Sequence, residues 1–386
     1  MKAFVAEADW NPRKNYALTA EELRTKRAVV GSQAWQHPRF EIRDVPAPAI
    51  GNEELLIRVV NCGICGSDTH TYETDGDGYI LFSGPTKLPC ILGHELSGEV
   101  VEVGREVVGF QKGDIVTSES IMWCGKCLPC RSGMLNQCEN VELMGLTSNG
   151  AFADFLSVKA AYCWKLNGLE DQFERNDIFR IGTLIEPIGC AYNGIFISGG
   201  GFLPGSNAIV YGAGPIGLGA VHLLRIAGAA TIIAIDVVKE RLDIAKKLGA
   251  DHVFNFNNEE RLEETIMEIT SGWGADIQVE AAGAAHKTIP LLQKVCSRRG
   301  KIIYLGRVDA SAQVDLNRVV SGAHSIIGSR GHSGYGVYSQ IIRLLQSGRL
   351  GGVKEIVTSV FPFSKIADGF ALSANRKDAK ILIEMS

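Results

Sequence analysis

The chain has 386 residues, of which 46% are apolar, and a formal net charge of −4. This length exceeds one ordinary compact domain, so we expect two domains, each with its own core. The negative charge and the lack of a basic block argue against a nucleic-acid partner, and no apolar run approaches the ~20 residues that span a bilayer. We therefore expect a soluble, cytoplasmic protein.

The first part of the chain is rich in short strands and turns. Apolar or alternating runs, separated by glycine and proline, occur in FEIRDVPAP, ELLIRVV, LSGEVVEVG and DIVTSE. Such runs are typical of small β-barrels. The sequence predicts a barrel-like β domain over residues 1–187.

Four cysteines lie close together in the segment CGKCLPCRSGMLNQC. They are Cys124, Cys127, Cys130 and Cys138. Thiols at this spacing can converge on one tetrahedral ion, and a closed four-thiolate site is typical of structural zinc. Disulfides are the alternative, but the N-terminus MKAFVAEADW has no apolar leader and the other cysteines are spread out, which favours a reducing compartment. The segment 124–138 is therefore predicted to be a zinc lobe.

From about Glu186 the sequence pattern changes to an alternation of apolar strand, glycine turn and amphipathic helix. This pattern predicts right-handed βαβ units around a parallel sheet. The expected strands are 207–211, 231–235, 252–254, 277–280, 301–305 and 325–327, and the expected helices are 216–227, 238–248, 262–270 and 285–296. Six strands fit a doubly wound dinucleotide-binding domain over residues 188–329. The segment 330–386, with a helix near 337–345 and the final strand AKILIEM, is expected to complete the first domain.

The run Gly212-Ala213-Gly214-Pro215-Ile216-Gly217 follows the strand NAIVY and opens a helix. Its glycines allow a tight turn, close approach of a pyrophosphate, and tight helix packing, while the helix N-terminus stabilises phosphate charge. Asp236 ends the next strand, where a carboxylate binds ribose hydroxyls and repels a 2′-phosphate. NAD is thus favoured over NADP, although the nearby Lys239 and Arg241 oppose that preference. We include Arg241 among the cofactor-binding candidates.

A second set of possible metal ligands is dispersed along the chain. Cys65, His94 and Glu95, with Glu186 as a further acid, offer a thiolate, an imidazole and carboxylates. A catalytic zinc takes three such ligands and leaves one position open. Spacing alone leaves the alternative of a core thiol and a surface histidine, because these residues are far apart in sequence.

The motifs GICGSDTH, GHELSGEVVEVG, the four-cysteine lobe, LIEP, GAGPIG and Asp236 occur in an order that resembles the zinc-dependent medium-chain dehydrogenase/reductase family. This family includes alcohol, sorbitol and threonine dehydrogenases. The resemblance covers essentially the whole chain. It implies α/β plus β architecture, with a GroES-like β-barrel catalytic domain, an inserted Rossmann domain and two zinc ions per subunit.

The resemblance also implies roles for individual residues. Cys65, His94 and Glu95 match ligands of the catalytic zinc, and Glu186 matches a fourth ligand that binds directly or through water. Asp68 matches the carboxylate that orients the ligand imidazole. Ser67 and His70 match a proton relay to solvent. Family members are commonly dimers or tetramers, so a homo-oligomer is expected.

Two stretches depart from the general family pattern. They are the N-terminal segment 8–38 and TYETDGDGYILFSGPTKLP. Together with GSRGHSGYG, they resemble the cyclitol-oxidising branch of the family, the scyllo-inosose 3-dehydrogenase-like enzymes. This implies a polyhydroxylated ring as substrate, for which Asp75, Asp77, Tyr79 and His332 are candidate hydrogen-bonding groups.

Several other functions remain open at this point. The alternatives are a sorbitol, threonine or aldose dehydrogenase, an aminocyclitol-biosynthesis dehydrogenase, and an inactive cofactor-binding protein. Loss of the open zinc site would be typical of the last. All the zinc-site candidates are present in this chain, so the sequence favours an enzyme.

Overall fold

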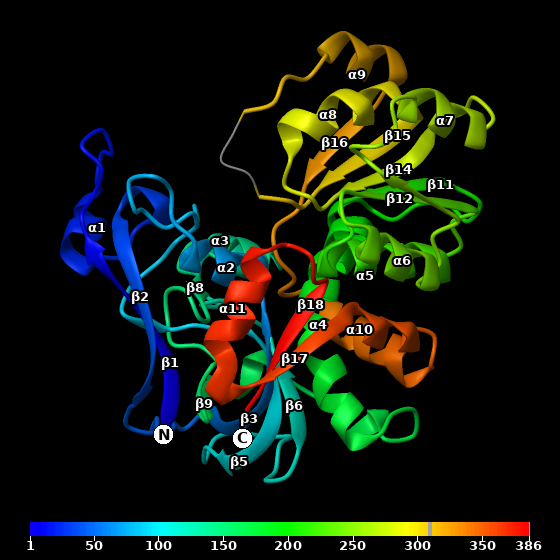
Figure 1. The fold of residues 1–386 in the computed structure, drawn as a ribbon. Coiled ribbons are helices and arrows are strands. Elements are labelled where there is room, and N and C mark those ends of the chain that lie inside the picture. The colour runs from blue at the N-terminus through cyan, green and yellow to red at the C-terminus, as the bar shows by residue number, and fades with distance from the viewer. Residues whose placement is uncertain (308–310, 386) are drawn as a thin grey trace. The chain divides into compact units, whose positions relative to one another are not determined.

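The computed structural model describes residues 1–307 and 311–385, which form two compact units (Figure 1). Unit 1 consists of Met1–Glu186 and Val357–Ser386, and unit 2 of Pro187–Ile356. None of the helices in the described parts of the chain has the length and apolar character needed to cross a membrane.

Unit 1 is built mainly from strands. These are β1 (Lys2–Trp10), β2 (Trp35–Asp44), β3 (Glu54–Ile64), β4 (Cys90–Ile91), β5 (Glu95–Val103), β6 (Ile115–Ser118), β7 (Ile121–Met122), β8 (Glu142–Leu143), β9 (Phe155–Lys159), β10 (Cys163–Lys165), β17 (Val357–Pro362) and β18 (Lys380–Glu384). Its helices are α1 (Ala20–Thr25), α2 (Gly66–Tyr72), α3 (Leu128–Arg131) and α11 (Ile366–Ala374), while α4 (Arg175–Tyr192) begins in unit 1 and ends in unit 2.

The main sheet of unit 1 has the order β10-β6-β5-β3-β18-β17, and β9 also pairs with β3. In β3, Leu55, Ile57 and Val59 are buried whereas Arg58 is exposed, as expected for a strand with one face on a core. The C-terminal strand β18, red in Figure 1, pairs antiparallel with β3. Residues from both ends of the chain thus meet in one sheet.

Unit 2 contains a parallel six-stranded sheet of the order β13-β12-β11-β14-β15-β16. Its strands are β11 (Asn207–Tyr211), β12 (Thr231–Asp236), β13 (His252–Asn255), β14 (Ala275–Glu280), β15 (Cys296–Tyr304) and β16 (Ser325–Gly328). Its helices include α5 (Pro215–Ile226), α6 (Lys239–Lys247), α7 (Leu262–Ile269), α8 (Ala285–Lys294), α9 (Leu316–Gly322) and α10 (Val337–Gln346). Every predicted strand and helix of this domain is present, within a few residues of its expected bounds.

The two faces of this sheet are covered by different helices. Residues from α7 and α8 pack against Ile209, Tyr211, Ile233 and Ile235, and Figure 1 shows α5 and α6 on the other side of the sheet. The order of strands reverses between β11 and β14, so the crevice beyond their carboxyl ends is the switch point where doubly wound folds bind dinucleotides. The prediction of a doubly wound domain is confirmed.

The segment that returns to unit 1 begins later than the sequence suggested. Residues 330–356 were expected to belong with the first domain, but they lie in unit 2, and the return begins at Val357. The reason is packing: the 3-10 segment Gly351–Ile356 contacts α5 and α6. The predicted helix near residue 337 exists as α10, but it buries its apolar face within unit 2.

Candidate metal centres and dinucleotide site

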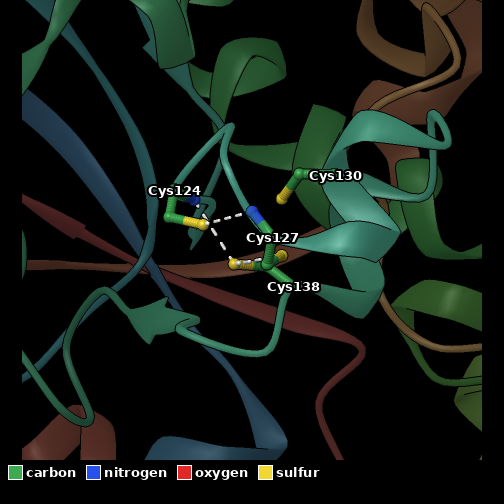
Figure 2. A group of neighbouring side chains, drawn as sticks. All are labelled: Cys124, Cys127, Cys130 and Cys138. Carbon is green, nitrogen blue, oxygen red and sulfur yellow. Dashed lines mark hydrogen bonds between the residues drawn. The ribbon is translucent and has the colours of Figure 1, made fainter.

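The four clustered cysteines lie together around α3. Figure 2 shows the sulfur atoms of Cys124, Cys127, Cys130 and Cys138 turned toward one another, and all four lie within 4.8 Å of one another as a possible metal group. None forms a disulfide. Backbone N–H groups of Lys126 and Cys127 donate to the Cys124 Sγ at 3.4 Å each. These donors lower the pKa of Cys124 to about 6, so its thiol is ionised at neutral pH, which is the form that binds zinc.

A second group of ligands is assembled from different elements. Cys65 caps the start of α2, Glu95 begins β5, and His94 immediately precedes that strand. One ligand atom from each lies within 4.8 Å of the others. Glu95 Oε1 is buried and has no hydrogen-bond partner. Buried polar atoms normally have partners, so this mixed centre fits a bound cation, and its donor set suits zinc.

Asp68 holds two of these ligands in place. Its Oδ2 accepts the Cys65 N–H at 2.9 Å and its Oδ1 accepts the Gly93 N–H at 3.3 Å, while Oδ1 lies 3.7 Å from His94 Nδ1. Burial alone would lower the pKa of His94, but the charges of Asp68 and Cys65 raise it well above its ordinary value. Asp68 therefore fixes the loop that carries Cys65 through a hydrogen bond, and its charge acts on the His94 ring from beyond hydrogen-bond distance.

Glu186 is near this centre but outside the close group of three ligands. It lies within α4, directly before Pro187, and its Oε1 accepts a hydrogen bond from Ser120 at 3.0 Å. Its charge still acts on His94 and Glu95. The structure thus brings Cys65, His94 and Glu95 together and leaves Glu186 at the edge of the centre.

Ser67 and His70 lie one turn apart on α2. Ser67 Oγ is 3.4 Å from His94 Nε2. Burial, followed by the charge of Arg376, lowers the pKa of His70 below 6.5, so its imidazole is neutral at pH 7 and can accept a proton. This arrangement supports the predicted relay.

The glycine-rich turn between β11 and α5 leaves room for a ligand. Gly212 has φ of 89°, and a Cβ at Gly217 would lie 1.7 Å from the Gly212 carbonyl oxygen, so both positions need glycine. A Cβ at Gly214, the N-cap of α5, would meet nothing within 4 Å. This open approach to the N-terminus of a long helix fits a pyrophosphate.

Asp236 lies beside the same turn, at the end of β12. Its Oδ2 accepts the Ala213 N–H at 2.6 Å and its Oδ1 accepts the Val238 N–H at 2.8 Å. A carboxylate has further lone pairs for ribose hydroxyls. Arg241 lies on α6, which begins at Lys239, and Lys239 is paired with Asp243 at 2.8 Å.

The two stretches that depart from the general family pattern pack together in unit 1. Trp35 Nε1 donates to the Thr86 carbonyl at 3.1 Å, and the Arg13 guanidinium lies 3.9 Å from the centroid of the Tyr79 ring. A polar hollow of about 610 Å³ lies at their surface. Its lining residues are Arg13, Lys14, Asn15, Gln33, Gln36, Asp77 and Tyr79.

Two of the suggested substrate-binding groups are engaged elsewhere. Asp75 pairs with Arg13 and accepts the N–H groups of Asp77 and Tyr79 at 3.0 Å each, so it stabilises its own loop. His332 is 0% exposed and packs its ring against Tyr338 at 5.2 Å between centroids. The expectation that these two side chains face a substrate is not supported by their contacts.

Sequence reasoning missed Lys380 at the mixed centre. Its Nζ donates to Glu95 Oε2 and, at 2.9 Å, to the Ile64 carbonyl oxygen. Burial acts to lower the pKa of Lys380, but the Glu95 carboxylate outweighs it and raises the pKa, so the ammonium stays charged. The available signal was a lysine at the start of the apolar run AKILIEM.

Comparison with known proteins gives matches to both units. Residues 51–168 match the model of the alcohol dehydrogenase GroES-like domain, and residues 215–347 match that of zinc-binding dehydrogenases. Scyllo-inosose 3-dehydrogenase from Thermotoga maritima is 39% identical over 90% of this chain and 91% of its own length. L-threonine 3-dehydrogenase from Bacillus licheniformis is 33% identical over 89% and 94%. A solved structure from T. maritima, assigned provisionally as an alcohol dehydrogenase, has a TM-score of 0.95, 36% identity and 99% coverage of both chains.

Proposed function

Because this chain belongs to the zinc-dependent medium-chain dehydrogenase/reductase family, we propose that it transfers a hydride between NAD and a secondary alcohol of a cyclitol or inosose. Membership confirms the resemblance found in the sequence, including the GroES-like and Rossmann domains. It makes the protein an oxidoreductase with zinc and a nicotinamide dinucleotide as cofactors. The ring substrate is the finer part of the proposal.

The mixed centre is the observation that carries the proposal. Cys65, His94 and Glu95 would hold the catalytic zinc, with Glu186 as a nearby further carboxylate. When bound, zinc would lower the pKa of a substrate hydroxyl, and NAD would accept the hydride. Ser67 lies where it can receive the hydroxyl proton, and neutral His70, on the same helix, can pass it to solvent.

The preference for NAD rests on Asp236. Its carboxylate lies within hydrogen-bond distance of the glycine turn, where it would bind ribose hydroxyls and repel a 2′-phosphate. Lys239 pairs with Asp243 at 2.8 Å on the exposed surface of α6.

The polyhydroxylated substrate is supported by the 39% identity to scyllo-inosose 3-dehydrogenase. A neutral polyol needs hydrogen-bonding groups rather than charge pairs. L-threonine is the second candidate, because threonine dehydrogenases match 89% of the chain. That substrate would need groups that bind an ammonium and a carboxylate.

The test is NADH formation by the zinc-loaded protein with each of myo-inositol, scyllo-inosose, an aminocyclitol, sorbitol, glucose, threonine and ethanol. The same reactions with NADP measure cofactor preference. We expect turnover with ring cyclitols or inososes and NAD. Turnover only with threonine or linear polyols would contradict the ring substrate, and turnover with none would contradict the dehydrogenase proposal.

We also propose that the protein is a homo-oligomer formed through β16. This strand ends the sheet order among the described strands, and the neighbouring Leu316, Val320 and Ile326 are exposed. An exposed strand edge beside apolar side chains favours pairing with a second copy. Light scattering gives the oligomeric state of the wild-type protein and of Val320→Asp. A monomeric wild type would contradict the proposed homo-oligomer.

A further inference from the structure

Lys380 is an unusual residue for the interior of a protein. Its side chain and that of Glu95 are each 1% exposed, and among the described lysines and arginines it alone is fully buried. A buried charge is costly unless it is paired and hydrogen-bonded. Lys380 meets that condition through the Glu95 carboxylate and the Ile64 carbonyl oxygen.

The pair depends on a glycine in the strand between its members. Strand β3 lies between β18 and β5, and Gly63 is the register partner of both Leu382 and Glu95. A Cβ at Gly63 would lie 2.3 Å from Glu95 Oε2 and 3.2 Å from the Lys380 side chain. The bare backbone at Gly63 therefore provides the space in which the lysine reaches the carboxylate.

The charges around the mixed centre are mostly negative. Cys65, Glu95 and Glu186 carry up to three negative charges when ionised, which exceeds the two positive charges of Zn²⁺, and Asp68 adds another behind His94. Lys380 is in direct contact with only one of these groups. Lys380 contacts Glu95 Oε2, whereas Glu95 Oε1 has no hydrogen-bond partner. Only Oε1 is therefore available to a metal.

We propose that Lys380 is the counter-cation of the mixed centre and a positioning residue for Glu95. By occupying Oε2 it prevents Glu95 from binding the metal with both oxygens. It also offsets one negative charge, which weakens metal binding and leaves more of the metal's charge to act on the substrate hydroxyl. This inference rests on the proposed role of Cys65, His94 and Glu95 as ligands.

The proposal predicts an effect opposite in sign to that of ordinary structural damage. In Lys380→Met the side chain keeps its approximate length but loses its charge, so zinc becomes the only cation near Glu95. We expect the rate of zinc release from this site to a chromophoric chelator to be about tenfold lower in Lys380→Met than in wild type. Zinc should also raise the unfolding temperature of Lys380→Met more than that of wild type.

Three variants serve as controls. Cys65→Ala identifies the phase of zinc release that comes from the mixed centre, because this variant should lack that phase. Lys301→Met removes a lysine of unit 2 whose Nζ donates to the carbonyls of Gly199 and Gly201 at 2.7 and 2.9 Å. Neither glycine is a candidate metal ligand, so this variant should release zinc at the wild-type rate. In the Glu95→Gln background, Lys380→Met should have no further effect on release, because it acts through Glu95.

Equal or faster zinc release from Lys380→Met would overturn the proposal, because that is the result of a purely structural role. Failure of Lys380→Met to fold in the presence of zinc would also overturn it, since zinc is expected to replace the missing charge. A wild-type protein that lacks the phase removed by Cys65→Ala would instead contradict the proposed zinc ligands themselves.

Discussion

The two candidate metal centres of unit 1 are built in opposite ways. The four-cysteine lobe draws its ligands from a single short segment, and neighbouring backbone N–H groups stabilise the thiolate of Cys124. The mixed centre draws its ligands from α2 and β5, and it is surrounded by buried charges, Asp68 and Lys380. A local loop is enough to close a structural site, whereas a reactive site needs groups that orient its ligands and set their charge.

Loss of a ligand from the mixed centre should have the largest effect on turnover. Cys65→Ala removes the thiolate, so we expect no turnover above background and a fall from two zinc ions per subunit to one. Changes in an outer contact of a metal ligand already cost about 10–100-fold. Zinc content and NADH formation, measured on the same sample, check this. Retained turnover in Cys65→Ala would contradict the assignment of the mixed centre as the reactive one.

Removal of the relay should have the next largest effect. His70→Gln is expected to lower kcat by at least about 100-fold, the usual contribution of a general base. Because burial lowers the pKa of His70 below 6.5, its neutral form persists below that pH, and turnover that depends on it declines only at lower pH. The pH profile of kcat should therefore have an acid limb below 6.5 in wild type. The same limb in His70→Gln would exclude this role.

Asp68→Asn leaves the metal ligands in place and removes the carboxylate that positions them. Asparagine keeps the shape but loses the charge beside His94 and can present only one acceptor oxygen to the N–H groups of Cys65 and Gly93. We expect a loss of about 10–100-fold in zinc affinity or turnover. Since the ligand Cys124 of the four-cysteine lobe is held by backbone N–H groups, the zinc of that lobe should be unaffected. Equal loss of both zinc ions would show that Asp68 acts on the whole fold.

The smallest effect on turnover is expected at the four-cysteine lobe. Cys124→Ser should remove one zinc and lower the unfolding temperature, because structural zinc contributes folding free energy. Turnover per folded, zinc-loaded mixed centre should stay within about twofold of wild type, because a closed four-thiolate site does no chemistry. Thermal unfolding and active-site titration together separate the two quantities. A large loss of kcat in folded Cys124→Ser would contradict a purely structural role for the four-cysteine lobe.

The features that sequence could predict are those encoded over short distances. The four cysteines and the strand, glycine turn and helix around Gly212 lie within single supersecondary units, so their spacing was sufficient. The contact of Lys380 with Glu95 depends on the register of β18 and β5 against β3, which spacing does not reveal. The return at Val357 was misplaced for a related reason, because α10 carries an apolar face that fits either domain. The roles of the individual site residues stay predictions.

The order in which strands join the main sheet of unit 1 has a consequence for biosynthesis. Because β18 carries Lys380 and pairs with β3, the ribosome releases Cys65, His94 and Glu95 long before their buried cation. In a nascent chain that lacks β18, a divalent ion would therefore bind Glu95 without competition from Lys380. Metal loading would then be easiest during translation, and docking of the last strand would lower the affinity to its mature value.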